Sequence, residues 1–222
     1  MTKNGFKLMK NGSSEAIYKR KTILGYDIFG SSPTNYTPVQ VLGFGVSKII
    51  KPVETITAEV NKHVQMNPPI HINTRSLSLT NYEMNRQKDS KRRLKSETTE
   101  EDVKEYADEV VEYLQNNAIP QLEKFNDLRE IDKIINGDDF WITDWQMPFN
   151  LGGNFYVKRL IVAKLAGNRK YEEVVRKNYE GSRQFLREAG NQKELDELDE
   201  SDLSQPIPFT VEYLKNVPSL YE

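Results

Sequence analysis

The hydrophobic pattern of the first third of the chain has the period of two that is typical of β-strands. Tyr36–Ile50 carries the most convincing strand pattern, and both of its faces are largely apolar, as in an interior strand that is covered on both sides. Turn residues separate the segments at Asn11–Ser14 and at Gly30–Asn35. This part of the sequence therefore predicts a strand meander.

One helix interrupts the meander. Proline is tolerated in a first helical turn, and after Pro52 apolar residues recur at helical spacing up to a break at Asn67–Pro69. Ile70–Leu79 then returns to strand-like alternation, with leucines alternating against serines. We expect the helix to lie between two strands of the same sheet region.

Helical periodicity dominates from Thr98 onward. Thr98 and Glu101 have the spacing of a capping box, and an apolar stripe follows. The stripe consists of Val103, Tyr106, Ala107, Val110, Val111 and Leu114. A break is predicted at Asn116-Asn117 and Pro120, before a shorter helix that contains Leu122 and Phe125. Further helices are predicted at Leu128–Ile135, Phe155–Ala166, Tyr171–Ala189, Lys193–Leu203 and Phe209–Asn216.

These elements predict an α+β fold, in which a mostly antiparallel N-terminal sheet with one helix is followed by a helical C-terminal half. Charge changes at the same place: residues 1–95 hold 16 Lys and Arg against 6 Asp and Glu, whereas residues 96–222 hold 15 against 27. We expect a basic strand-rich part at 1–85, a basic linker or loop at 86–97 and an acidic helical part at 98–222. A single domain with one shared core is the alternative.

Composition excludes several classes of protein. The 222 residues contain no cysteine, which excludes thiol catalysis, cysteine-bound zinc and disulfides and favours a reducing cytoplasm. The N-terminus lacks the apolar run of a signal peptide, and the apolar stretch Leu160–Ala163 is too short to cross a membrane. We therefore expect a soluble cytoplasmic protein without a membrane partner.

No cofactor or metal ion is predicted. The glycines of Leu42–Lys48 lie inside an alternating strand, whereas a phosphate cradle needs them in a turn before a helix. His63 and His71 flank the proline pair, but no metal-binding motif accompanies them, so surface positions are the favoured interpretation.

A run of basic residues between the two halves is the first candidate site. Such a run can bind phosphates, but Tyr82 is the only nearby aromatic residue for stacking on a base. A solvated linker is therefore the favoured interpretation, and nucleic acid is not expected as the partner. The candidate polyanion-binding residues are Arg86, Lys88, Lys91, Arg92, Arg93 and Lys95.

Both tryptophans lie beside three carboxylates within Asp138–Gln146. Aromatic residues beside carboxylates are found in sugar sites, which makes Trp141, Asp144 and Trp145 candidates for the ligand pocket of a small hydrolase or carbohydrate-binding protein. Packing in a core or an interface is the favoured interpretation, because tryptophan is mainly a large apolar residue.

An acidic run in the C-terminal part is the third candidate. Its carboxylates can attract and select a basic partner, while improved solubility is the alternative role. The candidate partner-binding residues are Glu194, Asp196, Glu197, Asp199, Glu200 and Asp202.

The order of several features resembles that of known families. Gly5-Phe6-Lys7 leads into the strand meander, the capped helix follows, and Ile119-Pro120 starts the next helix. Over residues 5–170 this order is similar to that of uncharacterised bacterial domain-of-unknown-function families, small cytoplasmic α+β proteins of which some are suspected of being immunity proteins. The resemblance implies no catalytic residues, and neither the basic linker nor the acidic tail has a counterpart in it.

The sequence thus favours a non-enzymatic cytoplasmic protein that recognises a basic protein through its acidic helices, for example as an immunity-type inhibitor. An enzyme or carbohydrate-binding protein built around the tryptophans is the second hypothesis. A polyanion-binding protein built around the basic run is the third.

Overall fold

The computed structural model describes residues 4–12, 15–36, 39–65, 75–79, 93–94, 98–137, 147–152 and 155–221. The chain forms two compact units, each assembled from separate segments. The sheet unit comprises residues 1–50, 77–126 and 148–150, and the helical unit comprises 51–76, 127–147 and 151–222. No helix within the described ranges is both long and apolar enough to cross a membrane.

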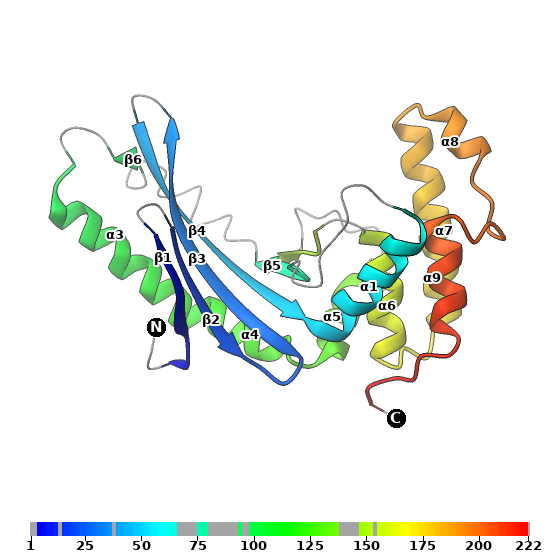
Figure 1. Cartoon of the computed structure of the whole chain (residues 1–222), viewed down its shortest axis with the longest axis horizontal. Coiled ribbons are helices and arrows are strands. Elements are labelled where there is room, and N and C mark those ends of the chain that lie inside the picture. The colour runs from blue at the N-terminus through cyan, green and yellow to red at the C-terminus, as the bar shows by residue number, and fades with distance from the viewer. Residues whose placement is uncertain are drawn as a thin grey trace. The chain divides into compact units, whose positions relative to one another are not determined.

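The described strands of the sheet unit form one antiparallel sheet (Figure 1). They are β1 (Lys7–Gly12), β2 (Glu15–Lys21), β3 (Gly25–Tyr36), β4 (Val39–Ile50), β5 (Leu77–Leu79), β6 (Arg93–Leu94) and β7 (Phe149–Asn150). The strand order is β1-β2-β3-β4-β5-β7, and β6 pairs with β4. β4 therefore has strand neighbours on both edges, which confirms an interior strand, while the cover expected on both of its faces stays a prediction.

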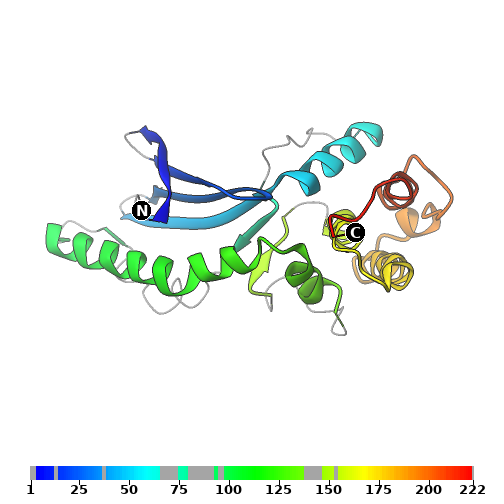
Figure 2. The same cartoon turned by 90° about the horizontal axis from the view of Figure 1, so that it is seen from below.

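A long helical segment covers one face of this sheet, as Figure 2 shows. It consists of α3 (Glu100–Tyr113), a π-helical turn (Leu114–Ala118) and α4 (Ile119–Lys124). Aromatic rings connect the two layers: the ring centroid of Phe44 on β4 lies 6.2 Å from that of Phe29 and 5.8 Å from that of Tyr113. Alternation along β4 places Phe44 and Val46 on this covered face.

The helical unit is built around α6. The helices are α1 (Lys51–His63), α5 (Leu128–Ile135), α6 (Phe155–Leu165), α7 (Tyr171–Glu188), α8 (Gln192–Asp196) and α9 (Pro206–Leu214). α6 contacts α1, α5, α7 and α9, and its residues from Val157 to Ala163 are all buried. A helix that is buried on every side belongs to the centre of a core. Together with the sheet, these helices confirm the predicted α+β class.

A charged pair lies inside the helical unit. The Lys158 ammonium on α6 is 3.1 Å from a carboxylate oxygen of Glu54, in the first turn of α1. The ammonium also donates hydrogen bonds to the backbone carbonyls of Leu151 and Arg75, at 3.0 and 3.2 Å. Both charged side chains are almost fully buried. Burial without these partners would cost several kcal/mol, so the pair ties α6 to α1 and to the segment that precedes β5.

The strand boundaries differ from the prediction in several places. The strand expected at Ile70–Leu79 is shorter where the structure describes it, because Arg75 and Ser76 lie before β5. The expected break at Gly30–Asn35 is wrong, because β3 runs through it and pairs residue by residue with β4 up to Tyr36. β2 pairs with β3 only as far as Ser31, so Pro33 lies where β3 has one described neighbour and its missing N–H is tolerated. The segment 86–97 is not a loop throughout, because Arg93 and Leu94 form β6.

The start of α3 is displaced by one residue from the predicted capping box. Thr99, and not Thr98, is the N-cap: its hydroxyl accepts a hydrogen bond from the Asp102 N–H, and the Asp102 carboxylate accepts one from the Thr99 N–H. Glu101 therefore lies outside the box. Two threonines are followed by two acids at the same spacing, so the sequence pattern fits either register.

Replacing Thr99 with alanine should lower the free energy of unfolding by about 1 kcal/mol, since the first turn of α3 loses its cap. Glu101→Ala, which removes the acid of the alternative box, should cost at most a few tenths of a kcal/mol, about the value of an exposed charge near a helix N-terminus. Urea unfolding followed by circular dichroism measures both values. A larger cost for Glu101→Ala would contradict the observed register.

The predicted break around Asn116-Asn117 and Pro120 is also wrong. Helical backbone continues through these residues, because the π-helical turn lets the Ile119 N–H donate to the carbonyl of Leu114, five residues earlier. Pro120 then lies in the first turn of α4, and the π-helical turn directly before it accommodates a residue that cannot donate a backbone hydrogen bond. Because of the π-helical turn, the residues after Leu114 lie on a different face of the helix from the one that regular α-helical spacing would give.

The helical stripe and the division of the chain also differ from expectation. Tyr106, Val110 and Leu114 are buried, whereas Val103 and Val111 are 38% and 41% exposed, so the buried stripe of α3 is narrower than predicted. α1 belongs to the helical unit, and the segment from α3 to α4 belongs to the sheet unit. The change of charge near residue 95 therefore does not coincide with the division into units. The units are set by how the apolar faces of the described helices pack.

Candidate functional site

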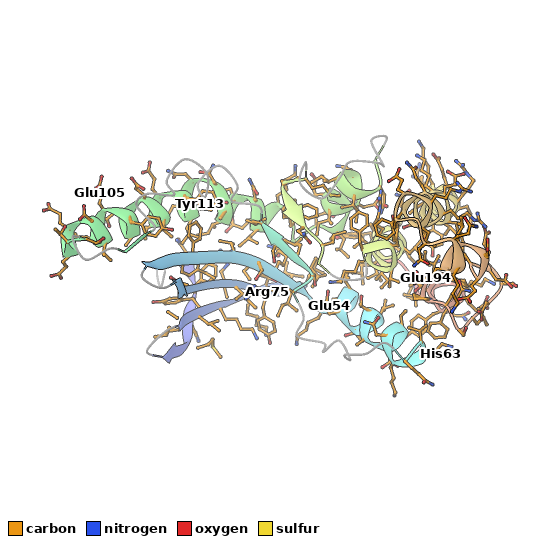
Figure 3. All side chains as sticks on the ribbon, turned by 90° about the horizontal axis from the view of Figure 1, so that it is seen from above. Glu54, His63, Arg75, Glu105, Tyr113 and Glu194 are labelled. Atoms are coloured by element: carbon orange, nitrogen blue, oxygen red, sulfur yellow. The ribbon has the colours of Figure 1, made fainter. Side chains whose placement is uncertain are left out.

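The acidic run predicted from the sequence lies in the helical unit, on α8 and in the turns that follow it. Glu194 is labelled in Figure 3. The structure describes all six carboxylate-bearing residues, and all are exposed except Asp202, which is partly exposed. The predicted helix Lys193–Leu203 is too long: α8 ends at Asp196. We call Glu194, Asp196, Glu197, Asp199, Glu200 and Asp202 the acidic surface.

Two aspartates of the acidic surface fix the turns after α8. Asp199 accepts hydrogen bonds from the N–H of Ser201 at 2.8 Å and from its hydroxyl at 2.7 Å. Asp202 accepts one from the N–H of Ser204 at 2.9 Å. Hydrogen bonds from these backbone N–H groups hold the pKa of each carboxyl below its usual range. Both aspartates therefore carry their negative charge at neutral pH.

Other contacts attach the acidic surface to its neighbours. Glu200 pairs with Arg183 on α7 at 2.6 Å, and Asp196 accepts a hydrogen bond from Gln192 at 2.6 Å. The amide of Gln205 donates to the backbone carbonyl of Glu197 at 2.7 Å. These contacts fix the backbone of residues 192–205 while leaving most carboxylates at the surface.

A second charged site lies in the sheet unit, between the sheet and α4. Lys48 on β4 and Asp27 on β3 are directly opposite in the strand register, and Lys48 Nζ lies 2.6 Å from Asp27 Oδ1. Arg20 on β2 donates two hydrogen bonds to Asp27 Oδ2, at 3.0 Å from Nε and 2.8 Å from its second terminal nitrogen. Lys48 also donates to Oδ1 of Asn126 at 2.8 Å. We call Arg20, Asp27 and Lys48 the buried charge cluster.

Burial sets the electrostatics of this cluster. The side chains of Asp27 and Lys48 are 0% exposed, and that of Arg20 is 14% exposed. Loss of water around the ammonium lowers the pKa of Lys48, and the charge and hydrogen bond of Asp27 oppose this effect. Two cations and one carboxylate thus share a region with little water.

A cavity of about 490 Å³ opens beside the cluster. It is lined by Arg20, Lys21, Thr22, Ile23, Glu123 and Asn126, which come from the end of β2, the turn before β3, the end of α4 and the residues just after α4. Glu123 contributes a carboxylate oxygen 3.1 Å from the first terminal nitrogen of Arg20. The cavity therefore combines hydrogen-bond donors with an apolar rim.

The other predicted site residues are placed only in part. Trp141, Asp144 and Trp145 lie outside the described residues, as do His71 and most of the basic run (Arg86, Lys88, Lys91, Arg92 and Lys95). Arg93 is described as a backbone position of β6. The hydrolase and polyanion hypotheses therefore stay predictions.

His63 ends α1 at the surface, as expected, and is labelled in Figure 3. Its ring stacks on Phe209 with centroids 3.7 Å apart, and Nε2 lies 3.1 Å from the carbonyl oxygen of Leu203. Within the described ranges, no group of three His, Asp or Glu side chains is arranged to hold a metal ion.

No family model, curated protein or solved structure matches the chain. The resemblance to domain-of-unknown-function families therefore stays a prediction. The case for any function depends on the geometry of the acidic surface and of the cavity beside the buried charge cluster.

Sequence reasoning missed the buried charge cluster. The signal was present in β4, where alternation places Lys48 on the same face as Phe44 and Val46. A lysine at a core position of an interior strand needs a buried acid, and Asp27 holds the matching position in β3.

Proposed function

We propose that this protein is a non-enzymatic binding protein of the cytoplasm, which recognises a basic protein partner through the acidic surface. The observation that carries the proposal is the placement of six carboxylates on one short, locally fixed segment of the helical unit. A cysteine-free composition favours the cytoplasm. An immunity-type inhibitor is the specific role that we propose.

The charges support a basic partner in particular. Lys193 lies 3.9 Å from Glu197, and Arg183 pairs with Glu200, so two cations face six carboxylates. Among the described residues, Glu194 forms no ion pair. The excess negative charge attracts a basic protein at long range and raises its association rate.

Local fixation of the segment supports binding as well. The hydrogen bonds of Asp199 and Asp202 order the turns before any partner arrives. Less conformational entropy is then lost on binding, so more of the contact energy contributes to affinity.

A charge-reversal experiment tests the proposal. The triple variant Glu194→Lys, Asp196→Lys and Glu197→Lys leaves the Asp199 and Asp202 turns and the Arg183 pair intact. Its control, Glu59→Lys, Asp108→Lys and Glu112→Lys, makes the same charge change at exposed positions that are spread over α1 and α3. Each tagged protein is incubated with extract of its source cells, and retained proteins are identified by mass spectrometry.

We expect the wild-type protein and the control variant to retain the same basic protein, and the acidic-surface variant to lose it. Equal loss in both variants would indicate a general charge effect and would contradict the proposal. Retention that is unchanged in the acidic-surface variant would contradict it as well.

A further inference from the structure

The buried charge cluster carries more positive than negative charge. Arg20 and Lys48 contribute two cations, and Asp27 contributes one carboxylate. The guanidinium of Arg20 lies over the ring of Phe6, 5.0 Å from its centroid, which fixes its orientation. An excess charge in a region that is poor in water requires a nearby anion.

Glu123 supplies that anion from outside. It belongs to the last residues of α4, and its side chain is 59% exposed. Its carboxylate accepts a hydrogen bond from one terminal nitrogen of Arg20 at 3.1 Å, whereas Nε and the second terminal nitrogen donate to Asp27. An exposed carboxylate thus accepts from the terminal nitrogen of Arg20 that Asp27 leaves unused.

Asn126 presents a second donor to the cavity. The Lys48 ammonium can only donate, so Oδ1 of Asn126 must face it, as observed at 2.8 Å. The NH2 group of the Asn126 side chain then remains for the cavity that this residue lines. Lys21 adds an exposed ammonium to the same wall.

We propose that the cavity beside the buried charge cluster binds a small molecule bearing a carboxylate or phosphate group. The oxyanion takes the place of Glu123 on Arg20 and accepts further hydrogen bonds from Asn126 and Lys21. Charge-assisted hydrogen bonds of this kind are stronger than neutral ones. The side chain of Ile23, 92% exposed at the rim, contacts the apolar part of the ligand.

The size of the cavity is compatible with a small ligand that stays partly in solvent. Its volume of about 490 Å³ lies within the range of small-molecule sites, but the cavity is wide open to solvent and not enclosed. The site belongs to the sheet unit and shares no residue with the acidic surface, so the two proposals can fail independently.

Titration of Glu123→Gln with inorganic phosphate and with succinate tests the inference. Glutamine keeps the shape of Glu123 but removes the competing charge, so we expect this variant to bind one of the two anions about three- to tenfold more tightly than the wild-type protein, a change of about 0.7–1.4 kcal/mol. The dissociation constants are measured by calorimetry and by the shift of the unfolding midpoint with anion concentration. Preference for phosphate or succinate identifies the head group.

Two further variants complete the test. Glu112→Gln removes an exposed carboxylate of α3 that does not line the cavity, and it should bind like the wild-type protein. Lys21→Met in the Glu123→Gln background should weaken binding again. The inference is overturned if neither anion binds Glu123→Gln in a saturable way, or if Glu112→Gln produces the same gain in affinity.

Discussion

Replacing Asp27 with asparagine is expected to lower the free energy of unfolding by about 3–5 kcal/mol, the range observed when one partner of a buried ion pair is removed. Asp27 is the only acid among the three residues of the buried charge cluster, and it accepts hydrogen bonds from both cations. Its loss leaves Arg20 and Lys48 close together with no buried counter-ion. Urea unfolding measured by circular dichroism gives the change.

Lys48→Met is the matched control for Asp27→Asn. Methionine fills a similar volume, and the pair of Arg20 with Asp27 remains neutral, so the cost should stay below about 1.5 kcal/mol. In the double variant, removal of Lys48 should recover part of the loss caused by Asp27→Asn. A cost of Lys48→Met that equals or exceeds that of Asp27→Asn would contradict the charge count of the cluster.

Lys158→Met is expected to have an effect of similar size, about 3–5 kcal/mol, in the helical unit. The substitution leaves the buried carboxylate of Glu54 without its cation. It also removes the donor for the carbonyls of Leu151 and Arg75. Tryptophan fluorescence and circular dichroism during urea unfolding measure the loss.

A double variant separates the charge effect from packing. In Glu54→Gln combined with Lys158→Met, no buried charge remains, so a large part of the lost stability should return. A loss that Glu54→Gln does not rescue would indicate a packing defect instead.

Much of the fold could be predicted from periodicity. The interior position of β4 follows from its two apolar faces, and the end of α5 follows from Asn136-Gly137. Period alone cannot place boundaries where two registers fit equally well, as with Thr98 and Thr99. Nor does periodicity predict the π-helical turn. The local residues favour a break there, but the helix continues because a backbone hydrogen bond spans five residues instead of four.

The candidate sites show the same limit. The acidic run lies at the surface, but its helix was predicted too long, because Asp199 and Asp202 bind nearby backbone N–H groups and favour turns. The buried charge cluster depends on pairing between β2, β3 and β4, which the spacing of residues in one strand does not give. Within a single strand, the sign of the cluster was Lys48, which lies at a position where the alternation of β4 predicts an apolar residue.

The most direct test of the proposed function is the dissociation constant of the captured basic partner, measured by calorimetry at about 50 and about 300 mM salt. Reversal of charge at Glu194, Asp196 and Glu197 should weaken binding at least about tenfold at the lower salt concentration, and the wild-type affinity should fall as salt rises. The control reversal at Glu59, Asp108 and Glu112 should stay within about twofold of the wild-type value, since single exposed charges away from an interface contribute little. Equal weakening by both reversals, or a wild-type affinity that does not change with salt, would contradict recognition through the acidic surface.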